Sequence, residues 1–109
     1  QITNDHTVVE YLHAKGIIDE QEMKVHKMKN VITRAVGVDS SVEVDYFEVD
    51  LKPGSVILIC TDGLTNYCSN ELIYSIIYKR PLEQAVGELI DYANNSGGKD
   101  NITAVLISA

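Results

Sequence analysis

Apolar and polar positions follow two different periods along the chain, so the sequence predicts helices and strands together. Apolar residues within 82–93 recur at the i, i+3, i+4 spacing of a helix that lays one stripe on a core. Pro81 suits the first turn of this helix, because its missing N–H needs no partner there. Ser69 or Asn70 can cap the helix before it. The run Val56–Cys60 is apolar throughout, which indicates a central strand covered on both faces.

Further segments carry a strand pattern. Residues 31–36 and 42–50 alternate in strand fashion, and 102–108 form a last apolar strand. The turn Lys52-Pro53-Gly54-Ser55 should join the strand at 42–50 to a strand at 55–60 as a hairpin, because proline presets φ and glycine accepts a positive φ. The sequence therefore predicts an α+β fold with mainly antiparallel strands in a partial α/β/β/α sandwich.

Two short amphipathic helices are predicted near the start of the chain. Asp5 can cap the first, which Gly16 ends as a left-handed stop. Asp19 and Glu22 have the spacing of a capping box for a second helix that runs to about Lys27. No internal repeat, low-complexity tract or linker follows from the pattern.

Composition narrows the class of protein. The chain has 109 residues, of which 45% are hydrophobic and 23% charged, as in one small globular domain. Its net charge of −7 disfavours nucleic acid, and its apolar runs are too short to cross a bilayer, so no nucleic-acid or membrane partner is expected. Cys60 and Cys68 lie in no CxxC arrangement. We expect reduced thiols and a cytoplasmic location.

Two glycine turns hold the candidate chemistry. Residues 60–64 read Cys-Thr-Asp-Gly-Leu at the end of one apolar run, and residues 97–101 read Gly-Gly-Lys-Asp-Asn before another. If the two strands lie side by side, Asp62 and Asp100 converge at one edge, where two carboxylates can share a divalent cation. The alternatives remain open at this point. Asp62 can belong to a simple Asp-Gly turn, and Asp100 can hydrogen-bond its own loop.

Four motifs in register make a family resemblance specific. The two glycine turns, the segment 30–37 (Asn-Val-Ile-Thr-Arg-Ala-Val-Gly) and the opening 3–7 (Thr-Asn-Asp-His-Thr) together resemble the C-terminal part of bacterial metal-dependent serine/threonine phosphatases of the protein phosphatase 2C family. The resemblance runs over essentially the whole chain. It implies hydrolysis of phosphoserine and phosphothreonine on phosphoprotein substrates by a metal-activated water. In bacteria, it implies a signalling role opposite serine/threonine kinases.

The resemblance also implies roles for individual residues. Asp62 and Asp100 match ligands of the second manganese or magnesium ion of a two-metal centre. Gly63 is expected to allow the turn, and Asn101 and Thr103 are expected to hold the loop behind the ligands. Residues 5–30 match a helical flap beside the catalytic centre, and residues 31–109 match the sheet and its packing helices.

Parts that relatives carry are absent from these 109 residues. An Arg and Glu-Asp segment, an Asp-Gly-x-Gly-Gly-His segment and an Asp-Ser-Arg segment do not occur. The chain therefore resembles the C-terminal portion of one catalytic domain whose N-terminal half is missing. We expect the isolated chain to be inactive. We also expect it to expose a sheet face that associates with the missing half or with itself.

Other polar residues are predicted to play structural parts. His6, His13 and His26 are not spaced as metal ligands, and a lone histidine is more often a surface or cap residue. Arg34 could bind phosphate, but an arginine in a strand more often pairs with a nearby carboxylate. We therefore assign these four residues no catalytic role.

Two other functions compete with the phosphatase interpretation. Haloacid-dehalogenase phosphatases also place Asp-Gly after an apolar strand, but their nucleophilic aspartate would fall at Cys60, which argues strongly against that class. A noncatalytic module that binds a divalent metal or a protein partner remains possible, because only two ligands are visible.

Overall fold

The computed structural model describes all 109 residues, in two units that span 1–49 and 50–109. The first unit holds α1 (Val8–Ala14) and α2 (Glu20–Val25). The second holds β1 (Val56–Cys60), α3 (Asp62–Thr65), α4 (Asn70–Lys79), α5 (Leu82–Asn95) and β2 (Ala104–Ser108). No helix combines the length and the apolar character that a membrane span requires.

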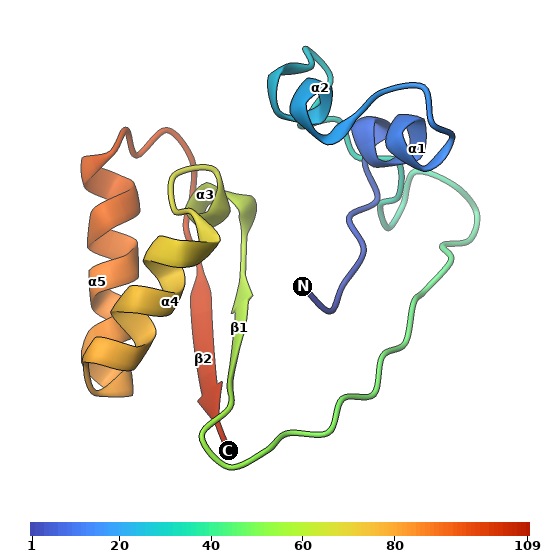
Figure 1. Ribbon diagram of the computed structural model, residues 1–109. Helices are drawn as coiled ribbons and strands as arrows, with labels where there is room; N and C mark the ends of the chain where they lie inside the picture. Colours follow the sequence, from blue (N-terminus) through green and yellow to red (C-terminus); the bar gives the residue numbers. More distant parts are fainter. The chain divides into compact units, whose positions relative to one another are not determined.

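The second unit is organised by one pair of antiparallel strands. β1 and β2 pair in a register that sets Val56 opposite Ser108 and Cys60 opposite Ala104. The helices α4 and α5 cover one face of this pair (Figure 1). The buried core lies between helices and strands, with Leu64 and Leu89 as its largest fully buried side chains. The predicted α+β class is confirmed, with the two strands antiparallel.

The two long helices form where the sequence predicted them. The Ser69 hydroxyl accepts a hydrogen bond from the backbone N–H of Leu72, so Ser69 is the N-cap of α4. Pro81 is the N-cap of α5, one position before the first turn in which it was expected. The predicted stripe on α5 is also confirmed, because Ala85, Leu89 and Ala93 are buried.

One face of the sheet lacks a cover within the second unit. Side chains at alternate positions of β1 and β2 point away from the helices, and Ile59, Val105 and Ile107 remain 57%, 48% and 43% exposed. The prediction that Val56–Cys60 is a strand is confirmed, whereas the second unit itself covers only the face of the strand that packs against the helices. Within β1, which is apolar at every position, Val56, Leu58 and Cys60 pack against the core and Ile59 is exposed.

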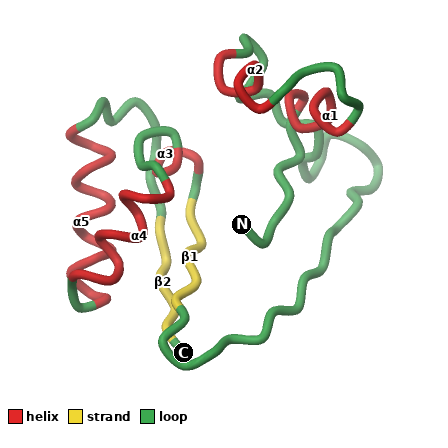
Figure 2. The backbone as a smooth tube through the Cα atoms, in the orientation of Figure 1, coloured by secondary structure: helices red, strands yellow, loops and turns green.

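Two predicted strands do not form. Residues 31–36 contain only an isolated bridge between Thr7 and Ile32, and residues 42–50 have no regular structure. Figure 2 shows the segment from α2 to β1 as loop throughout. The turn at 52–55 is present, with the Ser55 N–H bound to the Lys52 carbonyl at 2.9 Å, but it joins a loop to β1 and not two strands. Alternation alone gives no strand, because the backbone groups need a paired neighbour.

The first unit is made of the two short helices and the loops around them. The hydroxyl of Thr7 caps α1 by accepting from the Glu10 N–H at 3.2 Å, so the prediction of Asp5 as the cap is wrong. Two side chains form the expected capping box of α2, Asp19 and Glu22. This helix ends at Val25, slightly before the predicted end. Val9 is the one buried apolar residue of the unit.

Ion pairs centred on Asp45 hold the long loop of the first unit. One carboxylate oxygen lies 2.7 Å from Nε2 of His6, and the other accepts from Nη1 of Arg34 at 3.1 Å. Arg34 also lies 3.3 Å from the carboxylate of Glu43. The prediction that Arg34 pairs with a nearby carboxylate is therefore confirmed.

These contacts make the loop sensitive to acid. Hydrogen bonds from His6, and then from Arg34, lower the pKa of Asp45 below its ordinary value of 3.8. A carboxylate with a lowered pKa stabilises the fold above its unfolded pKa and loses that contribution as the pH falls through its folded pKa. We expect an NMR titration to show Asp45 detaching from His6 and Arg34 only at a pH below the ordinary carboxyl pKa of 3.8. Asp45→Asn should loosen the loop already at neutral pH, whereas Asp39→Asn, at an exposed position without ion pairs, should not.

Candidate metal centre

Asp62 lies where β1 ends and the short helix α3 begins. It is the first residue of α3, directly after the N-cap Thr61. Its side chain is exposed, and no protein group donates a hydrogen bond to its carboxylate. Both carboxylate oxygens of Asp62 are therefore free to bind a ligand.

Thr61 clamps the end of the β ladder to the segment that carries Asp100. Its backbone N–H donates to the carbonyl of Thr103 at 3.0 Å. Its hydroxyl accepts from the Thr103 N–H at 3.1 Å and donates to the carbonyl of Asn101 at 3.3 Å. One side chain thus ties residues 101 and 103 to the residue before Asp62.

Gly63 makes the closest approach between the two turns. A Cβ built on Gly63 would lie 2.2 Å from the carbonyl oxygen of Asn101. The φ of Gly63 is not positive, so its freedom to turn is not the reason for glycine, contrary to our expectation. Space is the reason, because the Asn101 backbone occupies the place of a side chain. Asp62 directly precedes Gly63, and Asp100 directly precedes Asn101. The contact between Gly63 and Asn101 therefore brings the backbones of the two aspartates together.

Asp100 has one oxygen engaged and one free. Its Oδ1 accepts from the backbone N–H of Asn101 at 2.7 Å, and its side chain is exposed. This is the local hydrogen bond that a loop aspartate makes in the absence of a ligand. The bond also orients the carboxylate, and the other oxygen makes no contact with the protein.

The donor set fits a hard divalent cation in part. Two exposed carboxylates are oxygen ligands of the kind that magnesium and manganese prefer, and magnesium sites often use one or two carboxylates together with water. No group of three or more His, Cys, Asp or Glu side chains occurs that could hold a metal ion. Asp62 and Asp100 can therefore contribute to a metal centre, but this chain supplies no third acidic ligand beside them.

The remaining candidates lie elsewhere. Arg34 and His6 are committed to Asp45 in the first unit. The backbone N–H of Met28 donates to Nδ1 of His26 at 3.0 Å. Cys60 and Cys68 are free thiols in the core of the second unit, and burial raises the pKa of each thiol. Neither thiol has the lowered pKa of a nucleophile.

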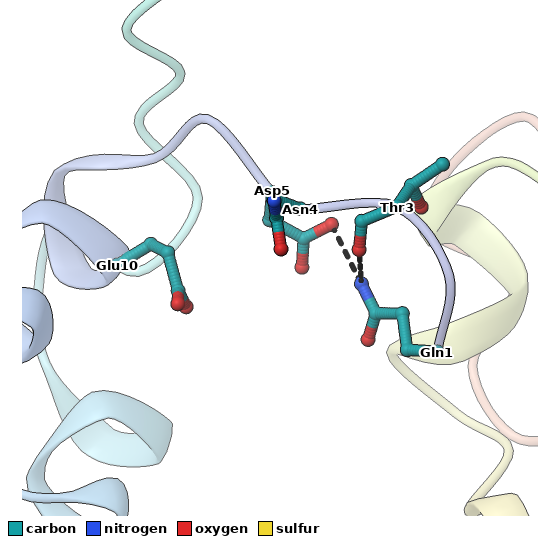
Figure 3. A pocket seen from close by; sticks show the side chains of 5 residues that line it. All are labelled: Gln1, Thr3, Asn4, Asp5 and Glu10. Atoms are coloured by element: carbon teal, nitrogen blue, oxygen red, sulfur yellow. Dashed lines mark hydrogen bonds between the residues drawn. The ribbon is translucent and has the colours of Figure 1, made fainter. Parts of the chain in front are cut away.

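The first unit has a polar hollow of about 210 Å³, formed by its opening residues. Figure 3 shows the Gln1 amide between its two acceptors, the Thr3 carbonyl at 3.0 Å and Oδ1 of Asp5 at 3.1 Å. Asn4 and Glu10 complete the lining. None of the predicted metal ligands belongs to this hollow.

Comparison with known proteins gives a consistent result. No family model matches the chain. It is 39% identical over 108 residues to "Serine/threonine phosphatase stp" of Listeria monocytogenes, across 98% of this chain and 43% of that protein. It is 42% identical over 107 residues to "Putative protein phosphatase 2C-type" of Streptococcus pyogenes, across 97% of this chain and 44% of that protein. Over nearly its whole length, this chain is similar to part of the phosphatases of the protein phosphatase 2C type.

Solved structures of this family have the same fold over the shared region. Serine/threonine phosphatase Stp1 from Staphylococcus aureus matches the whole chain with a TM-score of 0.92 and 33% identity, over 43% of its own length. The catalytic domain of the phosphatase PstP in complex with two manganese ions matches 97% of the chain with a TM-score of 0.75 and 31% identity. The chain thus spans less than half the length of these relatives.

Sequence reasoning overlooked contacts in each of the two units. Thr61 was part of a recognised motif, but only the register shows that its hydroxyl serves both residues 101 and 103. The His6 and Asp45 contact was also missed, because it joins residues far apart in the sequence. The Thr-Asp-Gly sequence after an apolar run is the feature from which a structural role of Thr61 could have been predicted.

Proposed function

We propose that this chain is the C-terminal part of a metal-dependent phosphatase that hydrolyses phosphoserine and phosphothreonine on proteins. Asp62 and Asp100 bind manganese or magnesium. The observation that carries the proposal is the contact between Gly63 and Asn101, which joins the two aspartate turns at the end of the paired strands. Relatives named as serine/threonine phosphatases, one of them solved with manganese, support the same reaction.

The chain's own residues hold and orient the ion. Asp62 offers a carboxylate without a protein partner, and the Asn101 N–H fixes the carboxylate of Asp100. Thr61 and Gly63 keep the two turns together. When bound, the metal supplies the charge that lowers the pKa of a coordinated water and makes it a nucleophile at neutral pH.

The isolated chain is expected to be inactive. Two carboxylates from one chain bind a divalent ion weakly, with Kd on the order of 10⁻⁴ to 10⁻³ M. The chain carries no further cluster of ligands to bind a second ion. Arg34 is paired with Asp45 and Glu43. Binding of the phosphate and protonation of the leaving oxygen are therefore left to residues outside this sequence.

We also propose that the missing half of the domain covers the open sheet face. The exposed aliphatic side chains of β1 and β2 support this, since a face of that kind is normally packed in a sandwich. An α/β/β/α sandwich would result, and self-association is the expected substitute when the half is absent. Two free thiols fit a reducing compartment, so the proposal places the enzyme in the cytoplasm.

A manganese-dependent phosphatase assay tests the function. The substrates are an aryl phosphate and a phosphothreonine peptide. The samples are this chain alone and a chimera that joins it to the N-terminal part of the Streptococcus pyogenes relative. We expect turnover by the chimera with manganese, none with chelator, and none by the chain alone.

Two results would contradict the proposal. Robust turnover by the chain alone would show that the chemistry lies elsewhere in it. A folded chimera that binds manganese without hydrolysing either substrate would favour a noncatalytic metal-binding or interaction module. The absence of a third acidic ligand is the observation behind that alternative.

A further inference from the structure

A sharp turn leads from α5 to Asp100. Gly97 has a φ of 150° and Gly98 a φ of 55°, both in the region that favours glycine. The N–H of Gly98 donates to the Ala93 carbonyl at 3.3 Å and so closes the end of the helix. Asp100 follows two residues later, and its position depends on this turn.

Tyr67 lies directly against the turn. A Cβ built on Gly97 would lie 2.8 Å from Cε1 of Tyr67 and 3.1 Å from its hydroxyl oxygen. The aromatic ring therefore fills the space in which any other residue at 97 would place a side chain. Tyr67 is half-buried and packs against the core cluster of the second unit, and its N–H donates to the Leu64 carbonyl at 3.1 Å.

The Asp100 loop is therefore held at both ends by the short segment 62–67. Gly63 contacts Asn101 on one side of Asp100, and Tyr67 contacts Gly97 on the other. The same segment begins with Asp62. A shift of the ring would move the loop relative to Asp62 and alter the separation of the two carboxylates.

We propose that Tyr67 is a positioning residue for the pair of carboxylates Asp62 and Asp100. Its ring, not its hydroxyl, sets the distance from segment 62–67 to the turn at Gly97, and through this distance it sets the affinity for a divalent cation. The inference rests on the proposed metal role of the two aspartates. Groups that orient ligands without touching the metal commonly change metal affinity by about 10- to 100-fold when they are removed.

The test measures manganese binding to the 109-residue chain by water-proton relaxation. Tyr67→Ala should raise the Kd about tenfold. Tyr67→Phe, which keeps the ring, should stay within about twofold, because no hydrogen bond of the hydroxyl is lost. Tyr74→Ala is the matched control, since it removes an exposed ring on α4 and should leave the Kd unchanged.

A second readout needs no metal. Amide chemical shifts and hydrogen exchange of residues 97–101 should change in Tyr67→Ala and not in Tyr67→Phe. Gly97→Ala should displace the same loop, and its effect should shrink when it is combined with Tyr67→Ala, because the smaller side chain leaves room for the added methyl. If Tyr67→Ala prevents folding, Tyr67→Leu takes its place as the variant without a ring: changed amide shifts of residues 97–101 and a raised Kd would support the positioning role, and unchanged values would overturn it.

The outcomes separate this inference from the function on which it rests. Unchanged Kd and unchanged amide shifts in folded Tyr67→Ala would overturn the positioning role. If Asp62→Asn leaves manganese binding unaltered, the metal role fails, and the amide shifts of the loop then decide the positioning role alone.

Discussion

Replacing Gly63 by alanine should separate the two aspartate turns and weaken metal binding more than any other substitution of one methyl group in this chain. The added Cβ would meet the Asn101 carbonyl oxygen at 2.2 Å and a side-chain carbon of Ile102 at 3.2 Å. A backbone oxygen cannot rotate away as a flexible side chain can, so the loop itself must move. Overpacking of this kind costs about 1 to 3 kcal/mol.

Gly87→Ala is the matched control for this substitution. Gly87 lies within α5, is exposed, and has no atom within 4 Å of the position of an added Cβ. A glycine inside a helix is less favourable than alanine by roughly 0.5 to 1 kcal/mol, so the control should stabilise the chain. The urea unfolding midpoint should therefore fall for Gly63→Ala and rise for Gly87→Ala, and only Gly63→Ala should weaken manganese binding. Equal stability and equal affinity would show that the Gly63 contact is not tight in solution.

Asp62→Asn and Asp100→Asn should each abolish most of the manganese-dependent activity of the chimera. The substitution keeps the size of the side chain and removes the negative charge that binds the cation. We expect kcat/KM to fall at least about 100-fold for either variant, as for the loss of groups that orient or hold a catalytic metal. The decrease should be partly recovered at high manganese concentration.

Asp91→Asn controls for the loss of one negative charge. Asp91 is exposed on α5 and makes no ion pair or side-chain hydrogen bond. Its substitution should leave kcat/KM and the manganese dependence unchanged. Wild-type turnover by both Asp62→Asn and Asp100→Asn would place the chemistry on other residues.

Sequence patterns predicted the structure correctly where a segment is stabilised by residues close to one another in the sequence. The Ser69 cap, the Asp19 capping box and the stripe on α5 each rest on residues within one or two turns of each other. The pairing of β1 with β2 entered the sequence analysis only as a condition, because the two strands are joined through two long helices, and the structure shows them paired. Local sequence therefore described most of the second unit.

The first unit shows where local rules stop. The alternation at 42–50 has the period of a strand, but no segment of this chain pairs with it. The loop is held instead by Asp45, whose partners His6 and Arg34 lie 39 and 11 residues away in sequence. An ion pair of this type depends on the tertiary structure, so the periodicity of the sequence does not predict it.

The candidate site was predictable to the level of its two carboxylates. Asp62 and Asp100 were visible because glycine turns after apolar runs place them at strand ends. The reason for Gly63 was not visible, since close approach and backbone freedom both select glycine. Only the three-dimensional structure shows that close approach, and not a positive φ, is the reason for glycine at position 63. The contact of Tyr67 with Gly97 lay outside sequence reasoning for the same reason.

The order of elements in the second unit also determines how the chain can fold while it is being synthesised on the ribosome. β1 emerges first, then α4 and α5, and the partner strand β2 comes only afterwards. At about 5 to 20 residues per second, the roughly forty intervening residues take several seconds to translate. During that interval the nascent strand has no ladder partner, whereas the two helices can already pack on each other. Until β2 is made, β1 can pack only against the pair of helices α4 and α5. A translational pause before residue 104 would therefore prolong the exposure of this aliphatic strand to chaperones and neighbouring chains.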